Sequence, residues 1–184
     1  MKHVYKQIED FFTSFYQGWS GAKQFEGSGE RLERFIKDSC WKSSVVEDEI
    51  DKCLKAVFDD SYDEMLVIGP TEVWTLCPHH FLPCKFNVHI GYVPNGKVLG
   101  LSKFSRVALI LGKRPTMQEQ YSRELADILY GVLSPDGLGV RVIGRHGCIE
   151  ARGVKQCLDV TTSTLLGSFK EDAKVRKEFF DLVG

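Results

Sequence analysis

The hydrophobic period of this sequence changes near Met65, and that change constrains the fold more than any other feature. Before it, apolar residues recur every three or four positions, as over residues 46–57, which predicts amphipathic helices. After it, apolar and polar residues alternate, most clearly over residues 85–92, which predicts half-buried strands. We therefore expect an N-terminal helical extension over residues 1–60 and a region that mixes strands and helices over residues 61–184, within one domain overall.

The second region mixes strand and helix patterns. The turn residues at 94–96 predict a hairpin after the first alternating run, and strand alternation resumes near Val140. Helical periodicity returns over residues 104–112 and 117–132, and again over the last turns, residues 175–182. This order predicts an α+β fold in which an antiparallel sheet carries helices on one face.

Composition narrows the classes of partner. Lys and Arg total 24 against 25 for Asp and Glu, so the net charge of -1 provides no general field for nucleic acid or an anionic membrane. The N-terminus lacks an uninterrupted apolar stretch, which predicts neither a signal peptide nor a membrane anchor. The six cysteines are therefore expected in a reducing cytoplasm, where cysteines bind metal, do chemistry or fill the core more often than they form disulfides.

Cysteine and histidine spacing predicts a metal site. Cys77 and His80 follow a strand-like run and lie in a turn, where both side chains can face one point. His146 and Cys148 are two residues apart in a second strand-like stretch, so they are expected on the same face. Two thiolates and one imidazole would leave the fourth zinc position open for water, as in catalytic sites. Cys84 could close that position, but its place in the alternating strand favours packing in the core.

Two further histidines flank the predicted ligands. His79 and His146 would remain as unligated imidazoles beside a zinc-activated water, and their near-neutral pKa suits general acid and base catalysis. The alternative is structural: His79 would only orient the turn, and His146 would only cap a strand.

A basic cluster predicts phosphate binding. Ser102, Lys103 and Arg106 lie at the start of a helix, where backbone N–H groups and the helix dipole favour anions. Arg152 lies four residues after Cys148 and would bring a further guanidinium to the metal site. The alternative for each cation is a solvated surface charge.

Gln118 and Glu119 offer an amide and a carboxylate near the start of the long helix. A carboxylate can accept hydrogen bonds from both N1–H and the exocyclic amine of guanine, a donor pair that adenine lacks. The alternative is that Glu119 only complements the helix dipole.

Together these residues resemble the type I GTP cyclohydrolases in order and spacing. The resemblance runs from about Ser61 to Leu182, and a basic pair upstream, Arg31 and Arg34, keeps the family's spacing. The motifs that carry it are Leu76-Cys77-x-His79-His80, His89-Ile90-Gly91-Tyr92-x-Pro94, the run 96–103, Arg106, Gln118-Glu119, His146-x-Cys148, Arg152-Gly153 and the run 161–167.

The resemblance implies a tunnelling fold, in which sheets of several chains form a barrel and two rings stack into a homo-oligomer, a decamer, with active sites between subunits. It also implies the role of each candidate residue. Cys77, His80 and Cys148 would bind zinc; His79 and His146 would transfer protons; Gln118 and Glu119 would contact guanine; Ser102, Lys103, Arg106 and Arg152 would contact the triphosphate; and Arg31 and Arg34 would reach it from a neighbouring chain.

The implied reaction is zinc-dependent hydrolysis of GTP to 7,8-dihydroneopterin triphosphate and formate, which feeds folate, biopterin or deazapurine synthesis. The sequence departs from the family pattern in two places: Pro78 replaces the usual glutamate, and Ser28-Gly29 replaces Thr-Pro before the basic pair. One alternative is therefore a cyclohydrolase that acts on another purine nucleotide or stops at the formamide. Two others are a non-catalytic relative that binds zinc and nucleotide, and a structural zinc protein.

Overall fold

A computed structural model describes residues 2–60 and 62–184 of the chain, so Ser61, where the predicted catalytic region begins, lies outside the described residues. The chain divides into two compact units, an N-terminal unit ending at Trp41 and a sheet unit running from Lys42 to Gly184. Helix α3 (Ser43–Leu54) packs against a helix of the sheet unit. The structural division therefore falls before this helix, whereas the change in hydrophobic period falls after it.

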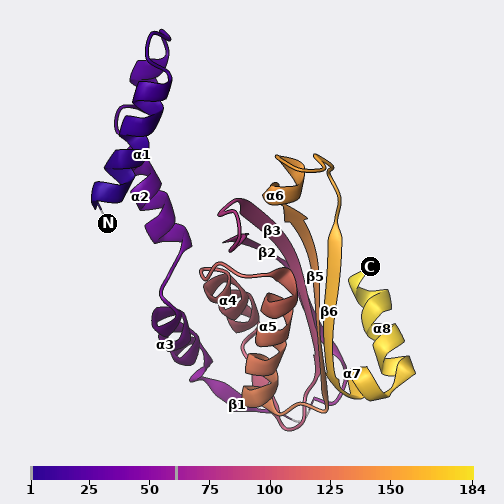
Figure 1. The fold of residues 1–184 in the computed structure, drawn as a ribbon. Helices are drawn as coiled ribbons and strands as arrows, with labels where there is room; N and C mark the ends of the chain where they lie inside the picture. Colours follow the sequence, from indigo (N-terminus) through magenta and orange to yellow (C-terminus); the bar gives the residue numbers. More distant parts are fainter. Residues whose placement is uncertain (1, 61) are drawn as a thin grey trace. The chain divides into compact units, whose positions relative to one another are not determined.

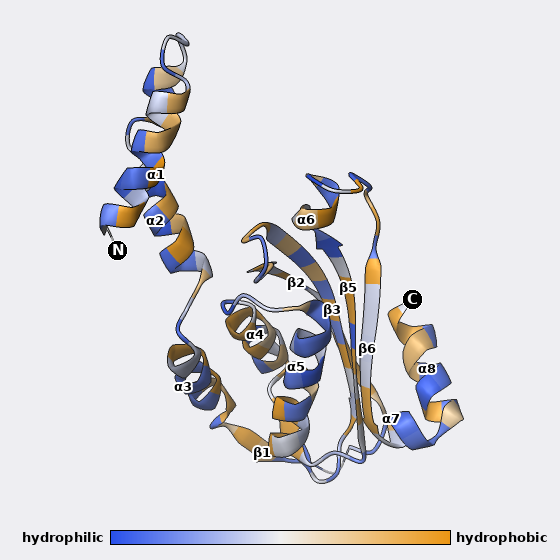
Figure 2. Cartoon of the chain, viewed as in Figure 1, coloured by the Kyte–Doolittle hydropathy of each residue, from blue (hydrophilic) through white to orange (hydrophobic). Residues whose placement is uncertain are grey.

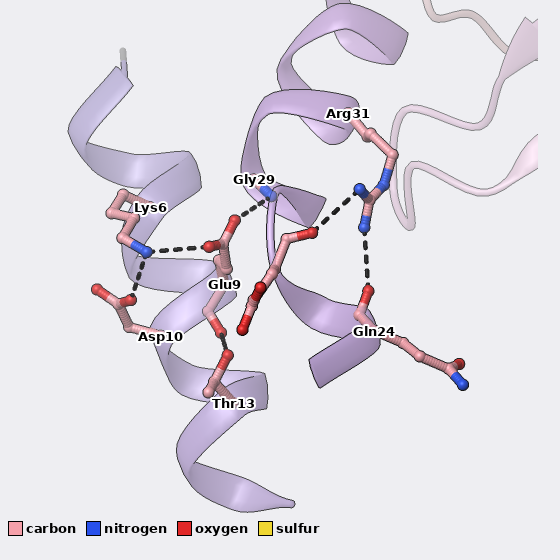
Figure 3. A network of polar contacts seen from close by, with 8 residues as sticks. Lys6, Glu9, Asp10, Thr13, Gln24, Gly29 and Arg31 are labelled. Carbon is pink, nitrogen blue, oxygen red and sulfur yellow. Dashed lines mark hydrogen bonds and ion pairs between the residues drawn. The ribbon is translucent and has the colours of Figure 1, made fainter. Parts of the chain in front are cut away.

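The N-terminal unit is a helical hairpin. Its elements are α1 (Lys2–Phe15), the 3₁₀ helix η1 (Ala22–Phe25) and α2 (Ser28–Ser39), and α1 lies alongside α2 (Figure 1). Gly29 permits this approach, because a Cβ atom there would lie 2.6 Å from the carbonyl oxygen of Tyr5. Its N–H donates to the Glu9 carboxylate at 2.9 Å, which ties the start of α2 to the middle of α1 (Figure 3).

The sheet unit contains two antiparallel sheets. One has four strands in the order β2-β3-β5-β6, and the other pairs β1 with β4. In chain order the elements of this unit after α3 are β1 (Val57–Asp59), β2 (Leu66–Leu76), β3 (Pro83–Val93), β4 (Lys97–Leu99), α4 (Leu101–Leu111), α5 (Gln118–Leu133), β5 (Gly137–His146), α6 (Gly147–Glu150), β6 (Val160–Gly167), α7 (Ser168–Glu171) and α8 (Ala173–Val183).

Alternating side chains make one face of the four-stranded sheet apolar, and the alternation is visible along β3 and β5 in Figure 2. Helices α4 and α5 cover this face. The ring of Phe86 on β3 packs 5.4 Å from that of Tyr121 on α5, and Tyr92 packs 5.1 Å from Phe104 on α4. All four residues are fully buried, so the main core lies between these helices and the sheet.

The opposite face is partly covered as well. The rings of Phe169 in α7 and Phe179 in α8 lie over two glycines of the central strands; a Cβ atom at Gly91 would lie 2.6 Å from Phe179, and one at Gly139 would lie 2.7 Å from Phe169. The α+β class and the antiparallel sheet are confirmed. The expected arrangement, with helices on one face of the sheet, holds for α4 and α5. Helices α7 and α8 instead lie on the opposite face, where the two glycines leave room for their aromatic rings.

The turn at residues 94–96 does not close the predicted hairpin. β3 pairs with β2 and β5, while the strand after the turn, β4, pairs with β1. The hairpin actually joins β2 to β3 through residues 77–82. That prediction was wrong because a turn signal shows where the chain reverses, but not which strand receives the next one. Among the described residues, no helix is long and apolar enough to cross a membrane.

Candidate active site

The turn between β2 and β3 brings the first two candidate ligands together. The N–H of Cys77 donates to the carbonyl of Leu82 at 2.9 Å, and the N–H of Phe81 donates to the carbonyl of Cys77 at the same distance. Phe81 adopts a left-handed conformation with φ of 53°, which reverses the chain. Within this closed loop, His80 Nδ1 lies 3.7 Å from Cys77 Sγ, and His79 Nδ1 lies 3.8 Å from it.

The third candidate ligand comes from the far end of β5. Ligand atoms of Cys77, His80 and Cys148 all lie within 4.8 Å of one another, so the three residues form one group that could hold a metal ion. Cys148 does not lie on a strand, as the sequence analysis expected, because β5 ends at His146 and Cys148 belongs to the single turn of α6. Its place in the group therefore comes from a helical turn rather than from strand alternation.

Gly147 explains how that turn reaches the ligand loop. A Cβ atom at this position would lie 2.8 Å from the carbonyl oxygen of Pro83, so only glycine lets α6 pass so close to the start of β3. The metal group consequently lies where the two central strands of the sheet meet the 77–82 turn.

The chemistry of the donors suits a soft or borderline cation. Burial raises the pKa of Cys148, and Cys77 raises it further, first through a hydrogen bond between the two side chains and then through the repulsion of two thiolates. A divalent cation would remove that repulsion by binding both sulfurs, and two thiolates with one imidazole are a set that zinc accepts with a fourth position left open.

His146 lies beside this group and is held by two side chains. Its Nε2 contacts Gln118 Oε1 at 2.8 Å, and its Nδ1 lies 3.4 Å from Cys84 Sγ. Burial lowers the pKa of His146, while the charges of Glu119 and Glu150 oppose that shift. The imidazole is therefore oriented by the protein before any ligand binds.

The adjacent residues Gln118 and Glu119 point into different surroundings. Gln118 is only 2% exposed, and its amide is engaged with the protein, whereas Glu119 is exposed. Only Glu119 therefore offers its polar group to a ligand in this structure. Sequence spacing could not separate the two roles, because both residues lie in the first turn of α5.

The predicted phosphate residues are distributed over two places. Arg152 contacts Nε2 of His80 through Nη1, so its guanidinium lies at the metal group. Ser102 and Arg106 are exposed on the first turns of α4, where the sequence predicted a helix start. Lys103 instead donates through Nζ to the carbonyl of Cys53 at 2.6 Å, at the C-terminal end of α3.

The upstream basic pair lies in the N-terminal unit. Arg31 donates to the carbonyls of Glu26 and Gln24, at 3.1 Å each (Figure 3). Arg34 lines a groove of the same hairpin together with Glu9. The structure thus places both arginines on the N-terminal unit and the metal group on the sheet unit.

Cys84 is the residue whose role the sequence did not predict. It is buried, as expected for a core residue, but it also contacts His146, which stands opposite it in the β3–β5 pairing. The alternating pattern shows that Cys84 faces the helices, yet only the strand register shows which residue is its partner.

The fold and the site together define an α+β protein whose antiparallel sheet carries a Cys₂His group at the ends of its central strands. The family profile described as GTP cyclohydrolase I matches residues 22–184. The chain is 41% identical over 160 residues to the GTP cyclohydrolase 1 of Campylobacter concisus, covering 86% of this chain and 84% of that protein. It is 39% identical to the GTP cyclohydrolase 1 of Chlorobaculum tepidum, covering 100% of this chain and 83% of that one.

A third relative extends the match along both chains. The GTP cyclohydrolase 1 of Methylococcus capsulatus is 33% identical over 183 residues, covering 98% of this chain and 99% of its own length. This chain therefore belongs to the GTP cyclohydrolase I family, which confirms the family and the tunnelling fold predicted from the motifs.

Proposed function

We propose that this chain is a zinc-dependent GTP cyclohydrolase I, which converts GTP to 7,8-dihydroneopterin triphosphate and formate. The observation that carries the proposal is the convergence of Cys77, His80 and Cys148 within 4.8 Å, in a chain that belongs to this family. Retention of His79 and His146 beside that group favours catalysis over nucleotide binding alone, because a binding protein has no need of proton-transfer groups.

The three ligands would hold zinc, which when bound supplies Lewis-acid chemistry for hydrolysis at C8 of the purine. His79 is exposed, and its Nδ1 lies 3.8 Å from Cys77 Sγ, so its imidazole would exchange protons with a substrate at the metal group. His146 is half-buried and is already oriented by its two partners. The two imidazoles thus differ in their exposure to solvent.

Substrate recognition would divide between the two polar clusters. Glu119, exposed at the start of α5, would accept hydrogen bonds from N1–H and the amine of guanine. Arg152, Ser102, Lys103 and Arg106 would bind the triphosphate. Lys103 now donates to a neutral carbonyl, and a triphosphate is the stronger partner for an ammonium group.

The assembled enzyme would be a cytoplasmic homo-oligomer, a decamer of two stacked rings, in which Arg31 and Arg34 reach the triphosphate of a neighbouring chain. Their positions support this role indirectly, because both lie on the N-terminal hairpin rather than on the unit that carries the metal group. The product would enter folate, biopterin or deazapurine synthesis.

The proposal is tested by incubating zinc-loaded protein with GTP, and measuring formate together with the fluorescent pteridine formed after oxidation. We expect both products, and neither from a Cys148→Ser control at equal protein concentration. Accumulation of a formamide without formate would indicate an enzyme that stops after ring opening. Turnover of another purine nucleotide in preference to GTP would change the substrate, and no turnover with full zinc content would favour a non-catalytic relative.

A further inference from the structure

The orientation of the Gln118 amide is fixed by its surroundings. Its Nε2 donates to the carbonyl oxygens of Val142 at 3.0 Å and Val160 at 2.8 Å, and also lies 3.2 Å from Thr162 Oγ1. If the amide were turned over, its own oxygen would face these two carbonyl oxygens, and acceptors with no hydrogen between them repel each other. The nitrogen must therefore face the strands, and Oε1 must face His146.

This orientation determines the tautomer of His146. Oε1 of Gln118 can only accept, so the Nε2 atom of His146, 2.8 Å away, must carry the hydrogen. In the neutral ring Nδ1 then holds a lone pair, and it faces the sulfur of Cys84 at 3.4 Å. A thiol can donate its hydrogen to such a nitrogen, so Cys84 and Nδ1 form a matched pair.

The backbone around this chain of contacts leaves room for it. A Cβ atom at Gly144 would lie 2.1 Å from Gln118 Oε1, so the amide rests directly on a bare part of β5. Cys84 Sγ also lies 3.9 Å from the carbonyl of Leu82, which gives the thiol a second acceptor when Nδ1 is engaged elsewhere. Gln118 can thus hold the imidazole of His146 while the thiol of Cys84 turns to the Leu82 carbonyl, which leaves Nδ1 free for another partner.

We propose that Gln118 and Cys84 are positioning residues that fix His146 as its Nε2–H tautomer, and that Gln118 does not contact the base. The proposal rests on the function proposed above and changes one assignment within it. Glu119 alone of the adjacent pair would recognise guanine, while Gln118 would act through His146 by presenting Nδ1 as the nitrogen with a lone pair. Loss of Gln118 should then impair turnover rather than substrate affinity.

The first test measures GTP affinity in metal-free protein, in which no turnover interferes. Gln118→Met keeps the length of the side chain but removes its hydrogen bonds, and we expect its dissociation constant for GTP to stay within about twofold of wild type. Glu119→Ala, the matched neighbour, should weaken binding by about tenfold or more, as expected from the loss of charged hydrogen bonds. Equal weakening by both variants would overturn the proposal and restore Gln118 as a base contact.

The second test separates kcat from KM in the zinc-loaded enzyme. Gln118→Met should lower kcat by about 10- to 100-fold with little change in KM, which is the usual cost of losing a supporting hydrogen bond at a metal site. Gly144→Ala serves as an independent variant, because its methyl group would displace the amide without removing it. A rise in KM at unchanged kcat in both variants would contradict the proposal.

The third test concerns the thiol and the tautomer. Cys84→Ser keeps a hydrogen-bond donor and should retain most of the wild-type kcat, whereas Cys84→Ala should lose several-fold; equal values would remove Cys84 from the arrangement. Nitrogen-15 spectra of histidine-labelled, metal-free protein, with His146→Asn used to assign the signal, should show Nε2–H in wild type and a mixture of tautomers in Gln118→Met. A wild-type Nδ1–H signal would overturn the proposal even if GTP turnover is found. If turnover is absent, the spectra and the GTP affinities still test the roles of Gln118 and Cys84.

Discussion

The two units of this chain hold their functional side chains in opposite ways. In the sheet unit, Gln118 is buried and oriented by backbone carbonyls, and the ligand turn is closed by hydrogen bonds of Cys77. In the N-terminal hairpin, Arg31 donates to two carbonyls of its own unit, and large rings such as those of Phe15 and Trp19 are 68% and 54% exposed. The comparison teaches that the three candidate ligands meet within the sheet unit, whereas the contribution proposed for the N-terminal arginines would depend on assembly with other chains.

The largest expected effect concerns the metal group. Cys148→Ser and His80→Ala should each lose bound zinc and reduce GTP hydrolysis to background, and chelation of the wild type should do the same, because each change removes a ligand or the metal itself. Elemental analysis beside a formate assay checks this. Cys157→Ser is the matched control, since this exposed cysteine lies outside the group and should retain both zinc and activity. Full metal content and turnover in Cys148→Ser would disprove the assignment.

The dependence of the N-terminal unit on assembly can be tested with hybrids. Chains carrying Arg31→Ala and chains carrying His146→Ala should each be inactive alone. If Arg31 serves a neighbour's site, mixed assemblies should regain part of the activity, because some sites would combine one intact half from each chain. No recovery despite demonstrated subunit exchange would show that both residues serve the same chain, or that Arg31 lies outside the site.

Substitution of Glu119 tests whether a residue of the sheet unit recognises guanine. Glu119→Ala should raise the KM for GTP by about 10- to 100-fold, since charged hydrogen bonds contribute about 1.5–3 kcal/mol each, and it should leave the zinc content unchanged. Gln120→Ala, at the next exposed position of α5, is the control and should bind GTP normally. An unaltered KM in Glu119→Ala would remove this carboxylate from the site.

Pro78 tests how far the ligand turn tolerates sequence change. Proline fixes its own φ and favours an extended Cys77, so it can keep the turn rigid without the carboxylate usual in the family. We expect wild type to hydrolyse GTP and Pro78→Glu to change that rate by no more than about 10- to 100-fold at matched zinc content. A silent wild type beside an active Pro78→Glu variant would identify this chain as a disabled relative.

The smallest expected effect lies in the N-terminal hairpin. The Gly29 N–H holds the pKa of Glu9 below its ordinary value, and Lys6 contributes in the same direction. Because the folded pKa is lowered, the stabilisation is present above the ordinary pKa of 4.5 and is lost as the pH falls through the lowered value. Glu9→Gln should therefore speed hydrogen exchange of the Gly29 amide at neutral pH, with a difference that fades in acid.

Glu26→Gln provides the control for this last experiment, since Glu26 serves Arg31 through its backbone carbonyl rather than its carboxylate. A constant difference between wild type and Glu9→Gln across the acid range would show that the ionised carboxylate does not hold the hairpin. The two units would then differ less in how they hold their side chains than their hydrogen bonds indicate.

Much of the fold followed from local pattern. The 3.6-residue period placed α4 and α5 to within a few residues, and alternation placed β3, because both periods are determined by backbone geometry over a few neighbours. The hairpin partner of β3 and the side of the sheet taken by α8 were not predictable in this way. Both depend on which surfaces pack together. For α8, Gly91 and Gly139 decide the side of the sheet, because they leave room for its aromatic ring.

The sequence by itself determined that Cys77 and His80 share one turn, because three residues cannot separate them far. Only the tertiary structure decided that Cys148 joins them from α6, that Gln118 is buried against β5 and β6 while Glu119 is exposed, and that Cys84 faces His146. These relations join residues 24 to 71 positions apart. Strand register and the close approach allowed by Gly144 and Gly147 set them, and neither leaves a periodic signal in the sequence.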